Sequence, residues 1–172
     1  MTLTTHAIVG AAAAKIFSFH PVLAGVAAFA SHFIIDAIPH WDYIPRSFQD
    51  SGDDPLHHDM EVGKHFFYDA LMIGADAMLG VALSLIIFPP ENMYSFLIVF
   101  IGACLGILPD PLQFVYWKWR HEPIVSLQRF HLWIHTSHRK WTKERRWMIG
   151  VVTQTILVGI ILTTTKLLTK FI

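Results

Sequence analysis

Histidine and aspartate residues recur at helical spacing in two separate parts of this chain. His32 and Asp36 lie four residues apart in an otherwise apolar stretch, so a helix places both side chains on one face. His131 and His135 repeat this spacing much later in the sequence. Imidazole and carboxylate groups in apolar surroundings are costly unless something pairs with them, and a divalent metal ion pairs with both. We therefore predict that these residues bind metal.

Further histidines and aspartates fall where a helical fold would bring them to the same place. His6 precedes Phe19 by 13 residues and His32 follows it by 13, so an antiparallel helical hairpin places the two imidazoles level. His40 and Asp110 follow the ends of apolar stretches, where they would reach the same membrane surface. The full set of predicted metal ligands is His6, His32, Asp36, His40, Asp110, His131, His135 and His138.

These residue types favour a catalytic rather than a purely structural metal centre. Imidazole and carboxylate ligands suit zinc, which we take as the first choice, with manganese or iron as alternatives. The single cysteine, Cys104, lies in an apolar run, which excludes disulfides and thiolate metal clusters. One to three ions bound here would generate hydroxide at neutral pH and stabilise both the attacking and the leaving oxygen of a phosphoester.

Two further aspartates are candidates for catalysis without being metal ligands. Asp69 and Asp76 are seven residues apart in an apolar stretch, so a helix places them on one face. A carboxylate within a membrane segment is a functional candidate by default. We predict that one of them acts as a general base or orients the imidazole ligands.

The composition indicates an integral membrane protein. Hydrophobic residues make up 53% of the 172 residues and charged residues 15%, with a mean hydropathy of +0.45. Three apolar stretches approach or exceed the length of about 20 residues that crosses a bilayer: 66–88, 93–108 continuing toward 116, and 148–168. Two shorter apolar segments, 4–19 and 21–38, predict a helical hairpin. We expect an all-α, multi-pass transmembrane bundle of about five helices in a single domain, 1–172.

Two polar connections, 39–65 and 118–147, are predicted to lie on one face of this bundle. The turn at 89–92 makes the first two spans antiparallel, so the chain returns to the face that it left. The connection at 118–147 is rich in lysine and arginine, which the positive-inside rule places in the cytoplasm. The formal net charge is zero, so nothing suggests nucleic acid. The expected partners are membrane lipids and a phosphoester substrate.

Short motifs along the chain resemble the YdjM-type inner-membrane metal-dependent hydrolases. The motifs are Thr5-His6 followed by Gly10, Ser-His-x-x-x-Asp at 31–36, Leu-Pro-Asp at 108–110, and the histidine-rich element at 131–138. That family is similar in motif style to the helical zinc phospholipase C and P1 nuclease group. The resemblance implies a small multi-pass protein of the prokaryotic inner membrane. It also implies metal-binding roles for His6, His32, Asp36, Asp110, His131 and His135.

The sequence leaves more than one function open. The first is hydrolysis of a phosphoester, with a phospholipid headgroup as one candidate, at the cytoplasmic side of the membrane. The second is a non-enzymatic metal or proton transporter that uses Asp76 and the histidines as a relay. A transporter should carry polar groups through both leaflets, and here the far leaflet has almost none. The third is a bis-histidine haem bundle, against which the many nearby aspartates argue.

Overall fold

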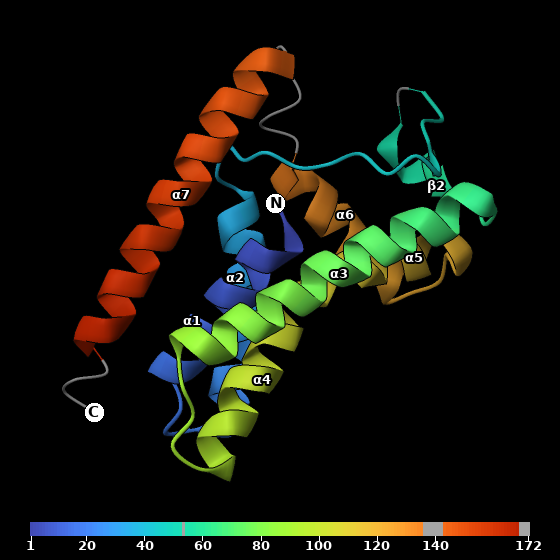
Figure 1. The fold of residues 1–172 in the computed structure, drawn as a ribbon. Coiled ribbons are helices and arrows are strands. Elements are labelled where there is room, and N and C mark those ends of the chain that lie inside the picture. Colours follow the sequence, from blue (N-terminus) through green and yellow to red (C-terminus); the bar gives the residue numbers. More distant parts are fainter. Residues whose placement is uncertain (53, 136–142, 169–172) are drawn as a thin grey trace.

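The computed structural model describes residues 1–52, 54–135 and 143–168, and most of them are helical (Figure 1). The chain begins with a hairpin of two helices, α1 (Leu3–Ile16) and α2 (Pro21–Asp36). The side chain of His20 accepts a hydrogen bond from the backbone N–H of Leu23 and so caps α2, while Pro21 occupies the first helical position. The predicted helical hairpin is confirmed.

Five more helices follow among the described residues. They are α3 (Lys64–Ile87), α4 (Met93–Ile107), α5 (Pro109–Lys118), α6 (Ile124–His135) and α7 (Lys143–Leu168). A two-stranded antiparallel sheet, β1 (Phe48–Gln49) and β2 (Asp59–Met60), and the short 3-10 helix η1 (Pro55–His57) lie in the connection before α3. The prediction of an all-α protein is therefore confirmed, although it did not include this small sheet.

Two of the described helices are long and apolar enough to cross a membrane. They are α3 and the Trp147–Leu168 part of α7, which correspond to the predicted spans 66–88 and 148–168. The third predicted span is bent by 44° between α4 and α5. Pro109 begins α5 at this bend, where a proline cannot donate the backbone hydrogen bond that would continue a straight helix. By length and composition the described part of the chain therefore has two candidate spans, or three if the bent pair counts as one.

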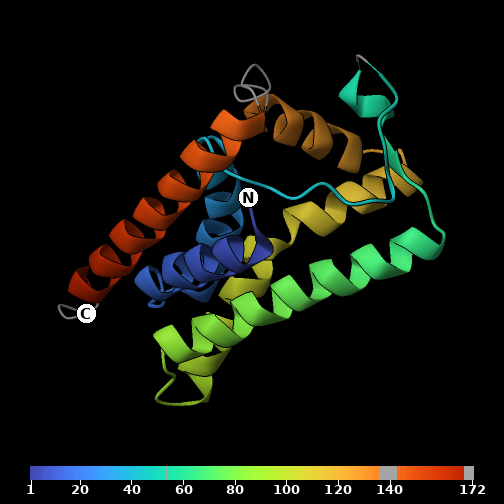
Figure 2. The ribbon, with the colours of Figure 1, turned by 45° about the horizontal axis from the view of Figure 1, so that its top comes forward.

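The helix α1 lies at the centre and packs against α2, α3, α4 and α7 (Figures 1 and 2). Small residues allow a very close approach to α4: a Cβ added at Gly10 would lie 2.5 Å from the backbone oxygen of Gly102, and one at Gly106 would collide with the backbone oxygen of His6. Buried alanines, among them Ala7, Ala11 and Ala103, fill the remaining contact. This packing brings His6 against the end of α4.

The helix α6 lies across one end of this bundle. Figure 2 shows it between the end of α5 and the start of α7, on the side where α3 and α7 begin. The segment that joins α2 to α3 runs along the same side (Figures 1 and 2). The C-terminal end of α2 and the start of α5 therefore meet α6 near one surface of the molecule.

Candidate metal centre

Five parts of the chain bring predicted metal ligands together at this surface. His32 and Asp36 lie in the last two turns of α2, and His40 follows that helix. The others come from α1 (His6), α5 (Asp110) and α6 (His131 and His135). The eighth predicted ligand, His138, lies outside the described residues.

The carboxylate of Asp36 is at the centre of the cluster. Its Oδ2 lies 3.1 Å from His32 Nε2, 3.2 Å from His131 Nε2 and 2.9 Å from His135 Nε2. His131 Nε2 is in turn 3.3 Å from His32 Nε2 and 3.2 Å from His135 Nε2. The side chain of Asp36 is completely buried. Three imidazole nitrogens and one carboxylate oxygen therefore lie close to one another.

The protonation of His32 makes this arrangement unfavourable without a cation. His32 Nδ1 lies 2.8 Å from the backbone oxygen of Gly106, which can only accept, so Nδ1 carries the proton and donates it. Neutral His32 therefore turns the lone pair of Nε2 toward the Asp36 carboxylate. A carbonyl that accepts from the second nitrogen is the usual way in which proteins orient a metal-binding histidine. Either a proton or a metal ion has to lie between Nε2 and Oδ2.

Asp110 adds a second carboxylate to the same group. Its Oδ1 lies 3.5 Å from His32 Nε2 and 3.9 Å from His131 Nε2, and its side chain is 28% exposed. The ligand atoms of His32, Asp36, Asp110 and His131 all lie within 4.8 Å of one another. Neighbouring ligands of a tetrahedral zinc ion with bonds of about 2.0–2.1 Å are separated by about 3.3 Å. The four side chains therefore have the composition and spacing of a metal site.

A second group of side chains surrounds the other oxygen of Asp36. His6 Nε2 lies 3.2 Å from Oδ1, His40 Nε2 lies 3.7 Å from it, and the Met1 amino nitrogen lies 3.3 Å from it. The ring of His6 is fully buried and stacks on the ring of His32 with the centroids 3.8 Å apart. The imidazoles of His6 and His32 therefore lie side by side in the hairpin, as their equal spacing from Phe19 predicts.

Burial also keeps two of the histidines in the form that binds metal. It lowers the pKa of His40 from 6.5 to about 3, and it lowers the pKa of His131 below its ordinary value. Both imidazoles are therefore neutral at pH 7. Because a metal ion binds only the unprotonated nitrogen, no proton has to be removed from these two ligands.

Asp76 accepts hydrogen bonds at the start of α1. Its carboxylate accepts hydrogen bonds from the backbone N–H groups of Leu3 at 2.8 Å and Thr4 at 3.3 Å, and from the hydroxyl groups of Thr4 at 2.6 Å and Tyr43 at 3.3 Å. The first N–H groups of a helix have no partner within the helix. Asp76 therefore caps α1 from a neighbouring helix, and it is not among the clustered ligand atoms.

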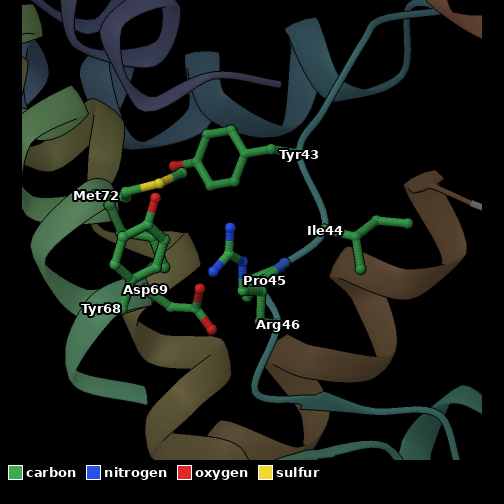
Figure 3. Close-up of a pocket in the computed structure, with 8 residues that line it drawn as sticks. Tyr43, Ile44, Pro45, Arg46, Tyr68, Asp69 and Met72 are labelled. Atoms are coloured by element: carbon green, nitrogen blue, oxygen red, sulfur yellow. The ribbon is translucent and has the colours of Figure 1, made fainter. Parts of the chain in front are cut away.

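Asp69 is likewise held away from the metal ligands. It accepts hydrogen bonds from the backbone N–H of Ser47 at 2.7 Å and from its hydroxyl at 2.6 Å. It lines a cavity of about 80 Å³ between residues 43–46 and α3, where the Arg46 guanidinium lies 4.5 Å from the centre of the Tyr68 ring (Figure 3). None of the predicted metal ligands that the structure describes lines this cavity. None of these contacts among the described residues joins Asp69 or Asp76 to the metal ligands: Asp69 holds the segment around Ser47, and Asp76 holds the start of α1. The base or orienting role of these two residues stays a prediction.

One functional residue escaped the sequence analysis. The backbone oxygen of Gly106 fixes the orientation of His32, and Gly106 also permits the close contact between α1 and α4. The spacing of Gly102 and Gly106, four residues apart in an apolar helix, is a recognisable signal for close helix packing. It gives no indication, however, that a carbonyl of this helix accepts a bond from a metal ligand.

Comparisons of the chain with known protein families, curated proteins and solved structures find no match. The resemblance to the YdjM-type hydrolases therefore remains a prediction from short motifs.

Proposed function

We propose that the protein is a membrane-embedded, metal-dependent hydrolase whose metal ion is bound by His32, Asp36, Asp110 and His131. The observation that carries this proposal is the convergence of imidazole nitrogens on the buried Asp36 carboxylate, with the proton of His32 held on the far nitrogen. Zinc fits this ligand set best, and manganese or iron are the alternatives.

The chemistry of the site favours hydrolysis of a phosphoester. A divalent ion bound here would supply hydroxide near neutral pH and polarise an oxygen of the substrate. Asp110 is 28% exposed and His135 is 30% exposed, whereas Asp36 and His32 are completely buried. Substrate and water would therefore approach from the side of α5 and α6, while α1 and α2 hold the ligands from behind.

The position of α6 supports a substrate at the membrane surface. Phe130 and Trp133 are 45% and 70% exposed on α6, next to the buried His131. Aromatic side chains of this kind concentrate at the boundary between lipid and water. Since α3 and α7 begin on the same side of the molecule (Figure 2), α6 would lie at the membrane surface. We infer a multi-pass protein of the prokaryotic inner membrane with its site toward the cytoplasm, and a phospholipid headgroup as one candidate substrate.

The contacts of Asp76 favour hydrolysis over transport. A proton or metal relay through the membrane would need this carboxylate to exchange its partners. Its described partners are instead the backbone of α1 and two hydroxyl groups, which belong to the packing of the fold.

Hydrolysis of a soluble phosphodiester, bis(p-nitrophenyl) phosphate, by the purified, zinc-loaded protein tests this proposal. We expect turnover that a chelator abolishes and zinc restores. His131→Ala should lower kcat/KM by at least about 100-fold, because a ligand should matter more than the groups that orient ligands, which account for about 10–100-fold. His57→Ala is the matched control, because His57 is 66% exposed and lies against Asp54, outside the cluster. Metal-loaded protein without activity on phosphomonoesters, phosphodiesters or phospholipid vesicles would contradict the proposed reaction.

A further inference from the structure

The two oxygens of Asp36 face two different sets of side chains. Oδ2 faces His32 and His131, whereas Oδ1 faces His6 and His40. His135 Nε2 lies 2.9 Å from Oδ2 and also belongs to a group with His40, so it lies between the two sets. A carboxylate with ligands on both sides can bridge two metal ions about 3.5–4 Å apart, as in two-metal hydrolytic sites.

His40 and His135 complete a group of three ligands with Asp36. Their ligand atoms and one carboxylate oxygen all lie within 4.8 Å of one another. The side chain of His40 is 4% exposed, and its Nδ1 lies 2.8 Å from the backbone oxygen of Ile38. Because that carbonyl can only accept, Nδ1 carries the proton and Nε2 is left with its lone pair. His40 is therefore oriented by a carbonyl in the same way as His32.

His6 provides an independent indication of a ligand on the Oδ1 side. It is fully buried, and neither of its ring nitrogens has a hydrogen-bond partner among the described residues. A buried polar atom without a partner costs about 1–3 kcal/mol, so such atoms call for an explanation. The Nε2 atom of His6 lies 3.2 Å from Asp36 Oδ1, where a cation bound to the carboxylate would give the His6 nitrogen a partner.

We propose that the protein binds a second divalent cation, held by Asp36, His40 and His135, with His6 as a further ligand. Asp36 then bridges the two ions. This inference rests on the proposed metal centre, which supplies the first ion. The Met1 amino group also lies near Asp36 Oδ1, at 3.3 Å, and near Asp42 Oδ2, at 3.5 Å. The second ion therefore has to compete with an ammonium group for this oxygen.

Loading of metal-free protein with Mn²⁺ tests the second site without reference to catalysis. We expect two Mn²⁺ ions per chain and an electron paramagnetic resonance spectrum that shows spin coupling between them. His40→Asn should leave one ion per chain with the uncoupled six-line spectrum, and His6→Asn should weaken the second binding step by at least about 10-fold. His57→Ala should keep two coupled ions. Circular dichroism of each variant establishes that the helices are retained.

The outcomes separate this inference from the proposed function. One ion per chain in the wild type, or two coupled ions in His40→Asn, would overturn the second site and leave the first intact. No bound ion in the wild type would overturn both. The wild-type stoichiometry decides the question even if a variant fails to fold.

Discussion

Asp36 and Asp76 are both carboxylates in apolar helices, but their partners differ in kind. Asp76 is surrounded by donors: two backbone N–H groups and two hydroxyl groups point toward it. Asp36 Oδ2 is surrounded by imidazole nitrogens, and because Nδ1 of His32 donates to the Gly106 carbonyl, a second proton or a metal ion has to lie between its Nε2 and the carboxylate. Hydrogen bonds therefore satisfy the Asp76 carboxylate. In Asp36 the Met1 amino group contacts Oδ1, whereas Oδ2 faces imidazole nitrogens that a proton or a metal ion has to join to it. The chemistry of the neighbours, rather than burial, therefore distinguishes a metal ligand from a structural aspartate.

This difference predicts which aspartate makes the stability of the protein depend on metal. Bound metal stabilises the folded state by about 4 kcal/mol when its concentration is 1,000 times the Kd. We expect a chelator to lower the thermal midpoint of the wild type and of Asp76→Asn, but not that of Asp36→Asn. Thermal unfolding followed by circular dichroism, with and without chelator, measures the effect. If a chelator lowered the thermal midpoint of Asp36→Asn as much as that of the wild type, Asp36 would not be the aspartate that binds the metal.

A second prediction concerns the contribution of Asp76 to the stability of the fold. Asp76→Asn removes the charge that accepts four hydrogen bonds at the start of α1, and we expect a loss of about 1–3 kcal/mol in the free energy of unfolding. Chemical denaturation in detergent measures this loss. Because Asp76 is not among the clustered ligands, metal affinity should stay within about 2-fold of the wild type. A large drop in metal affinity at unchanged stability would assign Asp76 to the metal centre after all.

A further expected effect is a dependence of stability on pH through His40. Its pKa is 6.5 in the unfolded chain and about 3 in the folded protein, so the unfolded state binds more protons between these values. The free energy of unfolding of metal-free protein should therefore fall as the pH is lowered from 6.5 toward 4. The slope should be smaller in His40→Asn, which has no such group. Equal slopes in the two proteins would show that burial does not depress this pKa.

Helical periodicity explains which parts of the site were predictable. The spacing of His32 and Asp36, and that of His131 and His135, places each pair on one helix face whatever surrounds it. The equal distance of His6 and His32 from the hairpin turn likewise predicts that they meet. Apolar length alone predicts α3 and α7.

The parts that escaped prediction depend on contacts between distant segments. The partners of Asp69 and Asp76, Ser47 and Thr4, are 22 and 72 residues away in the sequence, so no local pattern identifies them. The bend between α4 and α5 has a local signal in Pro109, because a proline cannot donate the backbone hydrogen bond that continues a straight helix. The two-residue strands β1 and β2 are too short to produce an alternating pattern.

Metal analysis of the purified protein and its two aspartate variants tests the central claim most directly. We expect the wild type and Asp76→Asn to retain at least one divalent ion per chain after removal of free metal, and Asp36→Asn to retain none. A wild-type protein without bound metal, or an Asp36→Asn protein with the full complement, would contradict the account.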